Sequence, residues 1–344
     1  MTIERHYKAA NYSLGDTNRP GYESCTGCGV CILPCPIWHQ TRDIMLTLCG
    51  RARALQQGSA SPKDLSESIM ACVLCGACEA ACPVGIDTVG MTRDLRRMLT
   101  ESGKSPLADR VASLEASGLR QGCLPARPGH SIFLHGTFAQ KNGALFKRAL
   151  SFLRMHNTIT PWLDGNVDIA VCIEAGLKVP DENRTQFIRS LTGAKEVIAT
   201  EGLLHRDLQR WLPRVPVVGL GEAILREKSI RQSLLPTDLY IIETRGFHSD
   251  WMRLVQIYDG LRRETGCLMS LDLQRIAIPS SAGCLQDRLG MNVLNPDEQV
   301  RLMTEGRRID RIVVESPEDM ELFQKVTRLQ VIHSCELVPV KGEI

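Results

Sequence analysis

The chain has 344 residues, a formal net charge of +2 and 43% hydrophobic residues. This length predicts two or three compact units rather than one. The charge gives no signal for a polyanionic partner, because the basic residues are spread among acidic neighbours, so we exclude nucleic acid. No apolar run reaches the ~18 residues that a membrane span needs. We therefore expect a soluble, cytoplasmic protein without direct membrane insertion.

After a polar arm over residues 1–20, the chain carries two cysteine runs with one spacing. The first run holds Cys25, Cys28, Cys31 and Cys35, followed by Pro36. The second run holds Cys72, Cys75, Cys78 and Cys82, followed by Pro83. Each run reads C-x2-C-x2-C-x3-C-P, which is typical of ferredoxins with two [4Fe–4S] clusters.

The same spacing predicts which thiolates hold which cluster. The first three cysteines of a run bind one cluster, and the fourth reaches the other cluster. The predicted ligands of the first cluster are Cys25, Cys28, Cys31 and Cys82. The predicted ligands of the second cluster are Cys72, Cys75, Cys78 and Cys35. Gly29 and Gly76 follow the second cysteine of each run and keep side chains away from the inorganic sulfides.

Two other uses of these cysteines fit less well. Structural zinc takes two C-x2-4-C pairs separated by a longer gap, whereas here four cysteines are packed into each short run. Disulfides need an oxidising compartment, and the N-terminus does not resemble a signal peptide. The remaining cysteines are isolated and are expected to be buried thiols: Cys49, Cys123, Cys172, Cys267, Cys284 and Cys335.

The segments around the two runs predict helices. We expect a helical connector over 41–55 and a helix that begins at Ser61-Pro62 and leads to Cys72. Asp87 is expected to cap a further helix whose buried face holds Val89, Met91, Leu95, Met98 and Leu99. These elements predict an α-helical ferredoxin domain over 1–117, because the insert between the runs is too long for the compact β-rich kind.

Beyond a Gly/Pro-rich linker at 118–129, the pattern alternates between strands and helices. Expected strands include Ser131–Leu134, Asp168–Cys172, Glu196–Ala199 and 216–218, with a helix over Ala139–Met155. The strand at Glu196–Ala199 is echoed by Arg311–Val314, and Val217-Val218 by Val331-Ile332 at nearly the same offset. We therefore predict two repeated α/β domains, at 130–230 and 237–344. The predicted fold class is α+β multidomain.

This organisation resembles the iron–sulfur subunits of the heterodisulfide reductase family, whose relatives serve glycolate oxidase and anaerobic glycerol-3-phosphate dehydrogenase. In that family each α/β repeat is a cysteine-rich domain with a Gly-Cys, a Cys-Cys-Gly and a C-x-x-C motif. In heterodisulfide reductase these motifs hold noncubane clusters. The resemblance spans almost the whole chain, with specific motifs in the ferredoxin part.

The repeats of this chain depart from those motifs. Thr137 stands at the first ligand position, and the middle motifs are reduced to Cys172 and Cys284. The remaining motif positions match Thr200-Glu-Gly-Leu203, Phe247-His248-Ser249-Asp250-Trp251 and Ser316-Pro-Glu-Asp319. One cysteine per repeat cannot hold a multi-iron cluster. The resemblance thus implies degenerate domains that keep the fold, serve as docking surface and no longer cleave a disulfide.

A few other residues have two readings. Cys172 and Cys284 are either buried structural thiols, which we prefer, or reactive thiols with a redox role. His248 is either a proton donor at a strand end or, with Asp250, a helix cap, which we prefer. Gly219-Leu-Gly221 opens a helix but lacks the rest of a dinucleotide fingerprint. No catalytic residue is predicted.

The sequence therefore predicts a non-catalytic electron-transfer subunit of an oxidoreductase complex. Electrons pass through two [4Fe–4S] clusters between a flavoprotein and a catalytic heterodisulfide-reductase-like subunit, with sulfur metabolism as the first choice. One alternative is the iron–sulfur subunit of a 2-hydroxyacid or glycerol-3-phosphate dehydrogenase. An alternative of another class is an iron–sulfur redox sensor or scaffold.

Overall fold

The chain divides into two compact units. The computed structural model describes residues 19–103, 105, 129–161, 167–288 and 294–337. Unit 1 comprises Met1–Gly118 together with Val171–Lys178 and Cys284–Asn295. Unit 2 comprises Leu119–Ala170, Val179–Gly283 and Pro296–Ile344. The predicted arm lies outside the described residues except for its last two positions, and the predicted linker does so except for Gly129.

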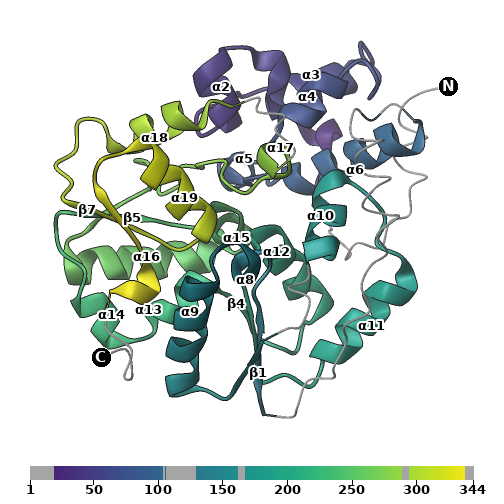
Figure 1. Ribbon diagram of the computed structural model, residues 1–344. Helices are drawn as coiled ribbons and strands as arrows, with labels where there is room; N and C mark the ends of the chain where they lie inside the picture. The colour runs from purple at the N-terminus through teal and green to yellow at the C-terminus, as the bar shows by residue number, and fades with distance from the viewer. Residues whose placement is uncertain (1–18, 104, 106–128, 162–166, 289–293, 338–344) are drawn as a thin grey trace. The chain divides into compact units, whose positions relative to one another are not determined.

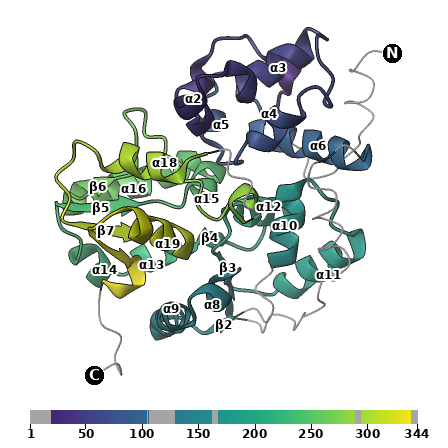
Figure 2. The same ribbon diagram turned by 45° about the horizontal axis from the view of Figure 1, so that its top comes forward.

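The N-terminal part of unit 1 is built from short helices (Figures 1 and 2). They are α2 (Pro36–Thr41), α3 (Leu48–Gln56), α4 (Ser66–Ala71), α5 (Ala77–Ala80) and α6 (Thr88–Glu101), with 3-10 turns η1 (Tyr22–Ser24), η2 (Val30–Ile32) and η3 (Ile44–Leu46). The predicted cap of α6 is confirmed, because the Gly90 amide donates to Asp87 Oδ1 at 2.9 Å. The predicted inner face of α6 is buried apart from Met98, which is half-buried.

Two helix predictions in unit 1 were wrong in their bounds. The helix expected over 41–55 begins only at Leu48, because α2 ends at Thr41, the 3-10 turn η3 follows, and Thr47 caps α3. The helix expected from Ser61 begins instead at Ser66. The Asp64 carboxylate accepts hydrogen bonds from the Ser61 amide and hydroxyl, at 2.9 and 2.5 Å, and this side-chain pairing closes a turn before α4.

Unit 2 contains two four-stranded parallel sheets with the same strand order. The first sheet runs β2-β1-β3-β4, and the second runs β6-β5-β7-β8. The strands of the first sheet are β1 (Ser131–Leu134), β2 (Ile159–Pro161), β3 (Glu196–Ala199) and β4 (Val217–Gly219). Those of the second are β5 (Asp238–Ile241), β6 (Leu268–Met269), β7 (Arg311–Val314) and β8 (Gln330–His333). The repeat of strands predicted from the sequence is therefore present as a repeat of topology.

Helices connect these strands, as parallel pairing requires. They are α8 (Phe138–Lys141), α9 (Gly143–His156), α10 (Val167–Ala175), α11 (Asp181–Leu191), α12 (Gly202–Trp211), α13 (Leu220–Leu225), α14 (Lys228–Gln232), α15 (Thr244–Ser249), α16 (Trp251–Thr265), α17 (Leu285–Arg288), α18 (Pro296–Thr304) and α19 (Pro317–Val326), followed by η4 (Ser334–Glu336). One buried core contains Phe133 of β1 and Tyr240 of β5, so the two sheets share apolar packing. Within unit 2 the structure is thus a mixed α/β arrangement of two parallel sheets and their helices.

Two predictions in this part of the chain were wrong. The strand expected at Asp168–Cys172 is helix α10, and the strand beside β1 is β2. A short apolar run such as Ile169-Ala-Val-Cys-Ile173 suits a buried helix as well as a buried strand, so its pattern does not decide between them. The helix expected over Ala139–Met155 is broken at Asn142, whose side chain accepts from the Leu145 amide at 3.0 Å and starts α9.

In the described residues no helix is both long and apolar enough to span a membrane.

Candidate metal centre

The two cysteine loops fold in the same way. Gly29 and Gly76 have φ of 74° and 80°, a left-handed conformation that glycine adopts without strain. Each glycine is followed by a short helical turn, η2 or α5, that carries the third cysteine of the run. The loops therefore place Cys31 and Cys78 in equivalent positions.

The first loop gathers thiols from both runs around Cys31. Burial, followed by the neighbouring thiols of Cys49, Cys25, Cys82 and Cys28 in that order, raises the pKa of Cys31 to about 12. Three of these neighbours are the predicted co-ligands of Cys31. Cys49 was expected to be an isolated thiol and is a neighbour that the spacing of the runs did not predict.

The second loop gathers the other four predicted ligands. Burial raises the pKa of Cys78 well above its usual value, and Cys75, Cys72 and Cys35 raise it further. The fourth cysteine of the first run thus lies beside the thiols of the second run. The hydroxyl of Thr88, at the start of α6, is 3.2 Å from the Cys78 sulfur and within hydrogen-bonding distance.

Two buried arginines flank Cys72. Burial opposes ionisation of this thiol, but the guanidinium groups of Arg51 and then Arg96 outweigh it and lower the pKa of Cys72. Each arginine is 1% exposed. Arg51 donates from Nη1 to the Ser68 carbonyl at 2.6 Å and to the Leu46 carbonyl at 3.2 Å. Arg96 donates to the Cys72 carbonyl.

These contacts fit a bound anionic cluster. In the described part of the chain, Arg51 forms no ion pair with a carboxylate, and its Nε is buried without a hydrogen-bond partner. A buried cation of this kind needs a compensating negative charge. A cubane held by four thiolates supplies such a charge, so the residues around Cys72 suit the group that the cysteine spacing predicts.

Segments from the second half of the sequence complete the second loop. Within unit 1, Gln286 donates from Nε2 to the carbonyls of Met70 and Cys72, at 2.6 and 2.7 Å. The Leu285 amide donates to Glu174 Oε1 at 2.7 Å, and Arg96 Nη1 donates to the Glu174 carbonyl at 2.6 Å. Glu174 and Leu285 each lie close in sequence to one of the two degenerate motif cysteines. Cys172 and Cys284 themselves are buried, at 9% and 3% exposed, which favours the structural reading.

The cysteine loops match a known iron–sulfur domain. Residues 21–86 match the 4Fe–4S dicluster domain. The chain is also 29% identical over 118 residues to the probable glycolate oxidase iron–sulfur subunit of Bacillus subtilis (strain 168). That match covers 32% of this chain and 26% of the relative, so this chain spans about a quarter of the relative's length. No solved structure matches the chain significantly. These matches support an iron–sulfur subunit.

The two cysteine loops differ in their exposure to solvent. Cys28 of the first loop is exposed, whereas its counterpart Cys75 in the second loop is buried at 8%. The first loop therefore offers a thiol at the surface, and the second is enclosed by Arg51, Arg96 and the segment around Gln286.

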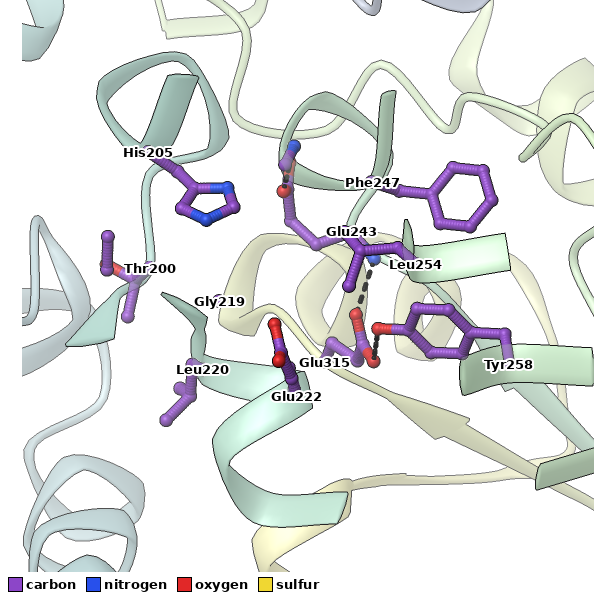
Figure 3. Close-up of a pocket in the computed structure, with 13 residues that line it drawn as sticks. Thr200, His205, Gly219, Leu220, Glu222, Glu243, Phe247, Leu254, Tyr258 and Glu315 are labelled. Carbon is purple, nitrogen blue, oxygen red and sulfur yellow. Dashed lines mark hydrogen bonds between the residues drawn. The ribbon is translucent and has the colours of Figure 1, made fainter. Parts of the chain in front are cut away.

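A second polar site lies in unit 2, where parallel strands of both sheets end (Figure 3). Thr200, Gly219, Glu243 and Glu315 follow or close β3, β4, β5 and β7 and line one pocket. The carboxyl ends of parallel strands are where α/β folds place ligands. The cavity volume is about 20 Å³, room for about one water. The predicted helix opening at Gly219-Leu-Gly221 is confirmed and lines this pocket.

Buried carboxyl groups dominate this pocket. Glu315 Oε1 accepts from the Tyr240 and Tyr258 hydroxyls, at 2.9 and 2.6 Å, and its Oε2 accepts from the Glu243 amide at 2.8 Å. Burial raises the pKa of Glu315 to about 7 and that of Glu243 to about 8. These groups can hold or release protons near neutral pH, and the sequence analysis did not single them out. The only available signal was a glutamate directly after an apolar strand.

The prediction for His248 was wrong in one respect. His248 lies inside α15, and the side chain of Asp250 does not cap the next helix, α16. Asp250 instead pairs with Arg253, at 2.5 Å between Oδ2 and Nε. The preferred capping role is therefore excluded for Asp250, because its carboxylate is taken by a guanidinium one turn along.

Proposed function

We propose that this chain is an electron-transfer subunit that binds two [4Fe–4S] clusters. The observation that supports the proposal is that thiols of both runs are neighbours: Cys82 is near Cys31, and Cys35 is near Cys78. In this proposal the first cluster is held by Cys25, Cys28, Cys31 and Cys82. The second is held by Cys72, Cys75, Cys78 and Cys35.

A bound [4Fe–4S] cluster takes up and gives back one electron at a time. The chain sets the ease of that exchange through charge, hydrogen bonds and access to water. At the second loop the cations of Arg51 and Arg96 and the hydrogen bond of Thr88 favour added negative charge. At the first loop the exposed Cys28 offers the side on which a partner can approach. In this proposal the first cluster exchanges electrons with the partner, and the second cluster holds the added electron.

We further propose a flavoprotein as one partner. The glycolate oxidase subunit matched by this chain supports a 2-hydroxyacid dehydrogenase type of complex. The heterodisulfide-reductase-like reading, with a catalytic partner subunit, rests on the layout of the dicluster domain followed by two sheets of equal topology. In both readings unit 2 acts as a docking part, and the chain itself carries no substrate chemistry.

The cluster content is tested on protein purified without oxygen. Iron and acid-labile sulfide are counted per chain, and the dithionite-reduced sample is examined by EPR. We expect about eight of each, with the broadened signal of two magnetically coupled cubanes. About four of each would leave one cluster and refute the two-cluster relay, and a zinc content of one or two with no sulfide would refute the iron–sulfur reading.

The partner is tested by purifying the tagged chain from its source cells under the same conditions. We expect a flavin-containing subunit in the complex, and glycolate should reduce the clusters if that subunit is a 2-hydroxyacid dehydrogenase. Reduction by a dithiol, but not by glycolate, would favour the heterodisulfide-reductase-like complex. Clusters that cannot be reduced through any flavoprotein but break down on mild oxidation would instead indicate a sensor.

A further inference from the structure

Helix α3 turns one face toward the first cysteine loop. Cys49, Arg53 and Gln56 recur at helical spacing and therefore share that face. Gln56 donates from Nε2 to the carbonyls of Glu23 and Cys25, at 3.0 and 3.1 Å. Arg53 Nε lies 3.4 Å from the position that a Cβ on Gly27 would occupy. The whole face, from Gln56 back to Cys49, thus packs along the loop.

Cys49 brings a fifth thiol to this loop. Its side chain is 4% exposed and neighbours the Cys31 thiol, because α3 packs on η2, the turn that carries Cys31. Cys25 and Cys28 are its other thiol neighbours. A [4Fe–4S] cluster uses four thiolates, so the first loop holds one more candidate ligand than the proposed cluster requires.

The second loop faces a different side chain of α3. The thiols that raise the pKa of Cys78 are Cys75, Cys72 and Cys35, all of them predicted ligands. The position facing that loop is held by Arg51, two residues after Cys49 on α3. The same short helix therefore gives a thiol to one loop and a cation to the other.

We propose that Cys49 is a reserve ligand of the first cluster, able to take the place of Cys31. This inference rests on the proposed cluster at the first loop. In the exchange the Cys49 thiol gives its proton to the leaving Cys31 thiolate, one iron–sulfur bond breaks and another forms. Iron keeps its oxidation state, so no oxidant or reductant is needed.

The experiment compares four variants purified without oxygen: Cys31→Ala, Cys49→Ala, the double variant of both, and Cys78→Ala as the matched control in the second loop. Iron and acid-labile sulfide per chain and EPR of the reduced protein are the readouts. We expect about eight irons in the wild type, in Cys49→Ala and in Cys31→Ala. The double variant and Cys78→Ala should each hold about four.

Two outcomes overturn the reserve role. In the first, Cys31→Ala falls to the iron content of the double variant. In the second, Cys49→Ala alone loses half of the iron, which would make Cys49 an obligatory ligand. A wild type without clusters would refute the proposed function instead. Retention of the EPR signal of the cluster whose ligands are unchanged shows that a variant is folded, and Cys31→Val replaces Cys31→Ala if that signal is lost.

Discussion

Arg51 is a single side chain that can raise the reduction potential of the proposed second cluster. It is buried, its charge lowers the pKa of the Cys72 thiol, and its acceptors in the described part of the chain are carbonyl and hydroxyl oxygens. The positive charge therefore acts on the thiolates nearby without being neutralised by a carboxylate. A cation in this position stabilises the more negative, reduced state of a cluster.

We expect Arg51→Gln to lower the reduction potential of the second cluster on the order of 50 mV, because one charge is lost at close range in a medium of low polarity. Redox titration followed by EPR measures the shift. Arg51→Lys, which keeps the charge, should recover part of it. Arg53→Gln is the matched control: Arg53 lies on α3 beside Gly27 of the first loop, so its loss should leave this potential unchanged. An equal effect of both variants would contradict the local charge argument.

Gly221 lines the pocket of unit 2 at a position with no room for a larger side chain. A Cβ at this position would stand 2.1 Å from the Glu315 carboxyl carbon, so the first turn of α13 can approach Glu315 only with glycine there. We expect Gly221→Ala to lower the free energy of unfolding by about 2 kcal/mol or more, since a buried carboxyl must move. Urea denaturation measures this change.

Gly260 provides the control for that substitution. It lies within α16, and a Cβ there would meet no atom within 4 Å. Gly260→Ala should therefore stabilise the protein by about 0.5–1 kcal/mol through helix propensity. If both variants changed stability in the same direction, the close approach of Gly221 to Glu315 would not be the cause.

At the scale of elements, the sequence predicted best where a strand is short, apolar and bounded by turns. β1 and β3 have the predicted bounds, and β7 coincides with the predicted echo of β3. Prediction failed at α10, because an apolar run carries the same pattern in a buried helix and in a buried strand. It also missed the break between α8 and α9, because Asn142 acts through a local hydrogen bond that overrides an otherwise continuous helical pattern.

The pairing of β5 with β7 is fixed by charge as well as by the backbone. Asp238 and Arg311 are register partners at the start of the two strands. Asp238 is fully buried, and Arg311 donates to its two carboxylate oxygens at 2.9 and 2.6 Å. Such a bidentate pair is strong only while both partners are present.

We expect Asp238→Ala to destabilise the protein by about 3 kcal/mol, because it leaves Arg311 without its partner in a mostly buried position. Thermal or urea unfolding measures the loss. The control is Arg226→Gln in the first sheet, where the guanidinium that pairs with Glu196 is 46% exposed. That pair is screened by water, so its loss should cost no more than about 1 kcal/mol. Equal costs for the two variants would contradict the role of burial.

At the scale of the whole molecule, the sequence alone predicted the cysteines of the candidate site but not the residues that surround them. The eight candidate cysteines follow from spacing in the sequence, because the proposed ligands lie within two short runs. Cys49 and the arginines beside Cys72 come from helices α3 and α6, and folding alone brings them to the loops. The carboxyl groups of the pocket come from the ends of different strands, so no local pattern joins Glu243 to Glu315.

The buried carboxyl groups of unit 2 link the stability of the fold to pH. Burial raises the pKa of Glu243 from 4.5 to about 8 and that of Glu315 from 4.5 to about 7. The folded state therefore holds protons that the unfolded chain has released, and stability is lost as the pH rises from 4.5 toward 8. Burial acts in the opposite sense on His333, lowering its pKa from 6.5 to about 4, so this group costs stability only below pH 6.5.

Between pH 6.5 and 8 the carboxyl groups act alone among these residues, and Glu243 is the last to ionise. We expect the free energy of unfolding to fall by about 2 kcal/mol across this range, at up to about 1.4 kcal/mol per pH unit for one proton. Glu243→Gln cannot ionise and should remove most of this slope, as measured by urea midpoints at several pH values without oxygen. Glu318→Gln, at a carboxyl outside the pocket, should keep it. A wild type whose stability is level or rises between these pH values would show that Glu243 is already ionised in the fold, held by the amides of Arg245 and Gly246 that donate to it.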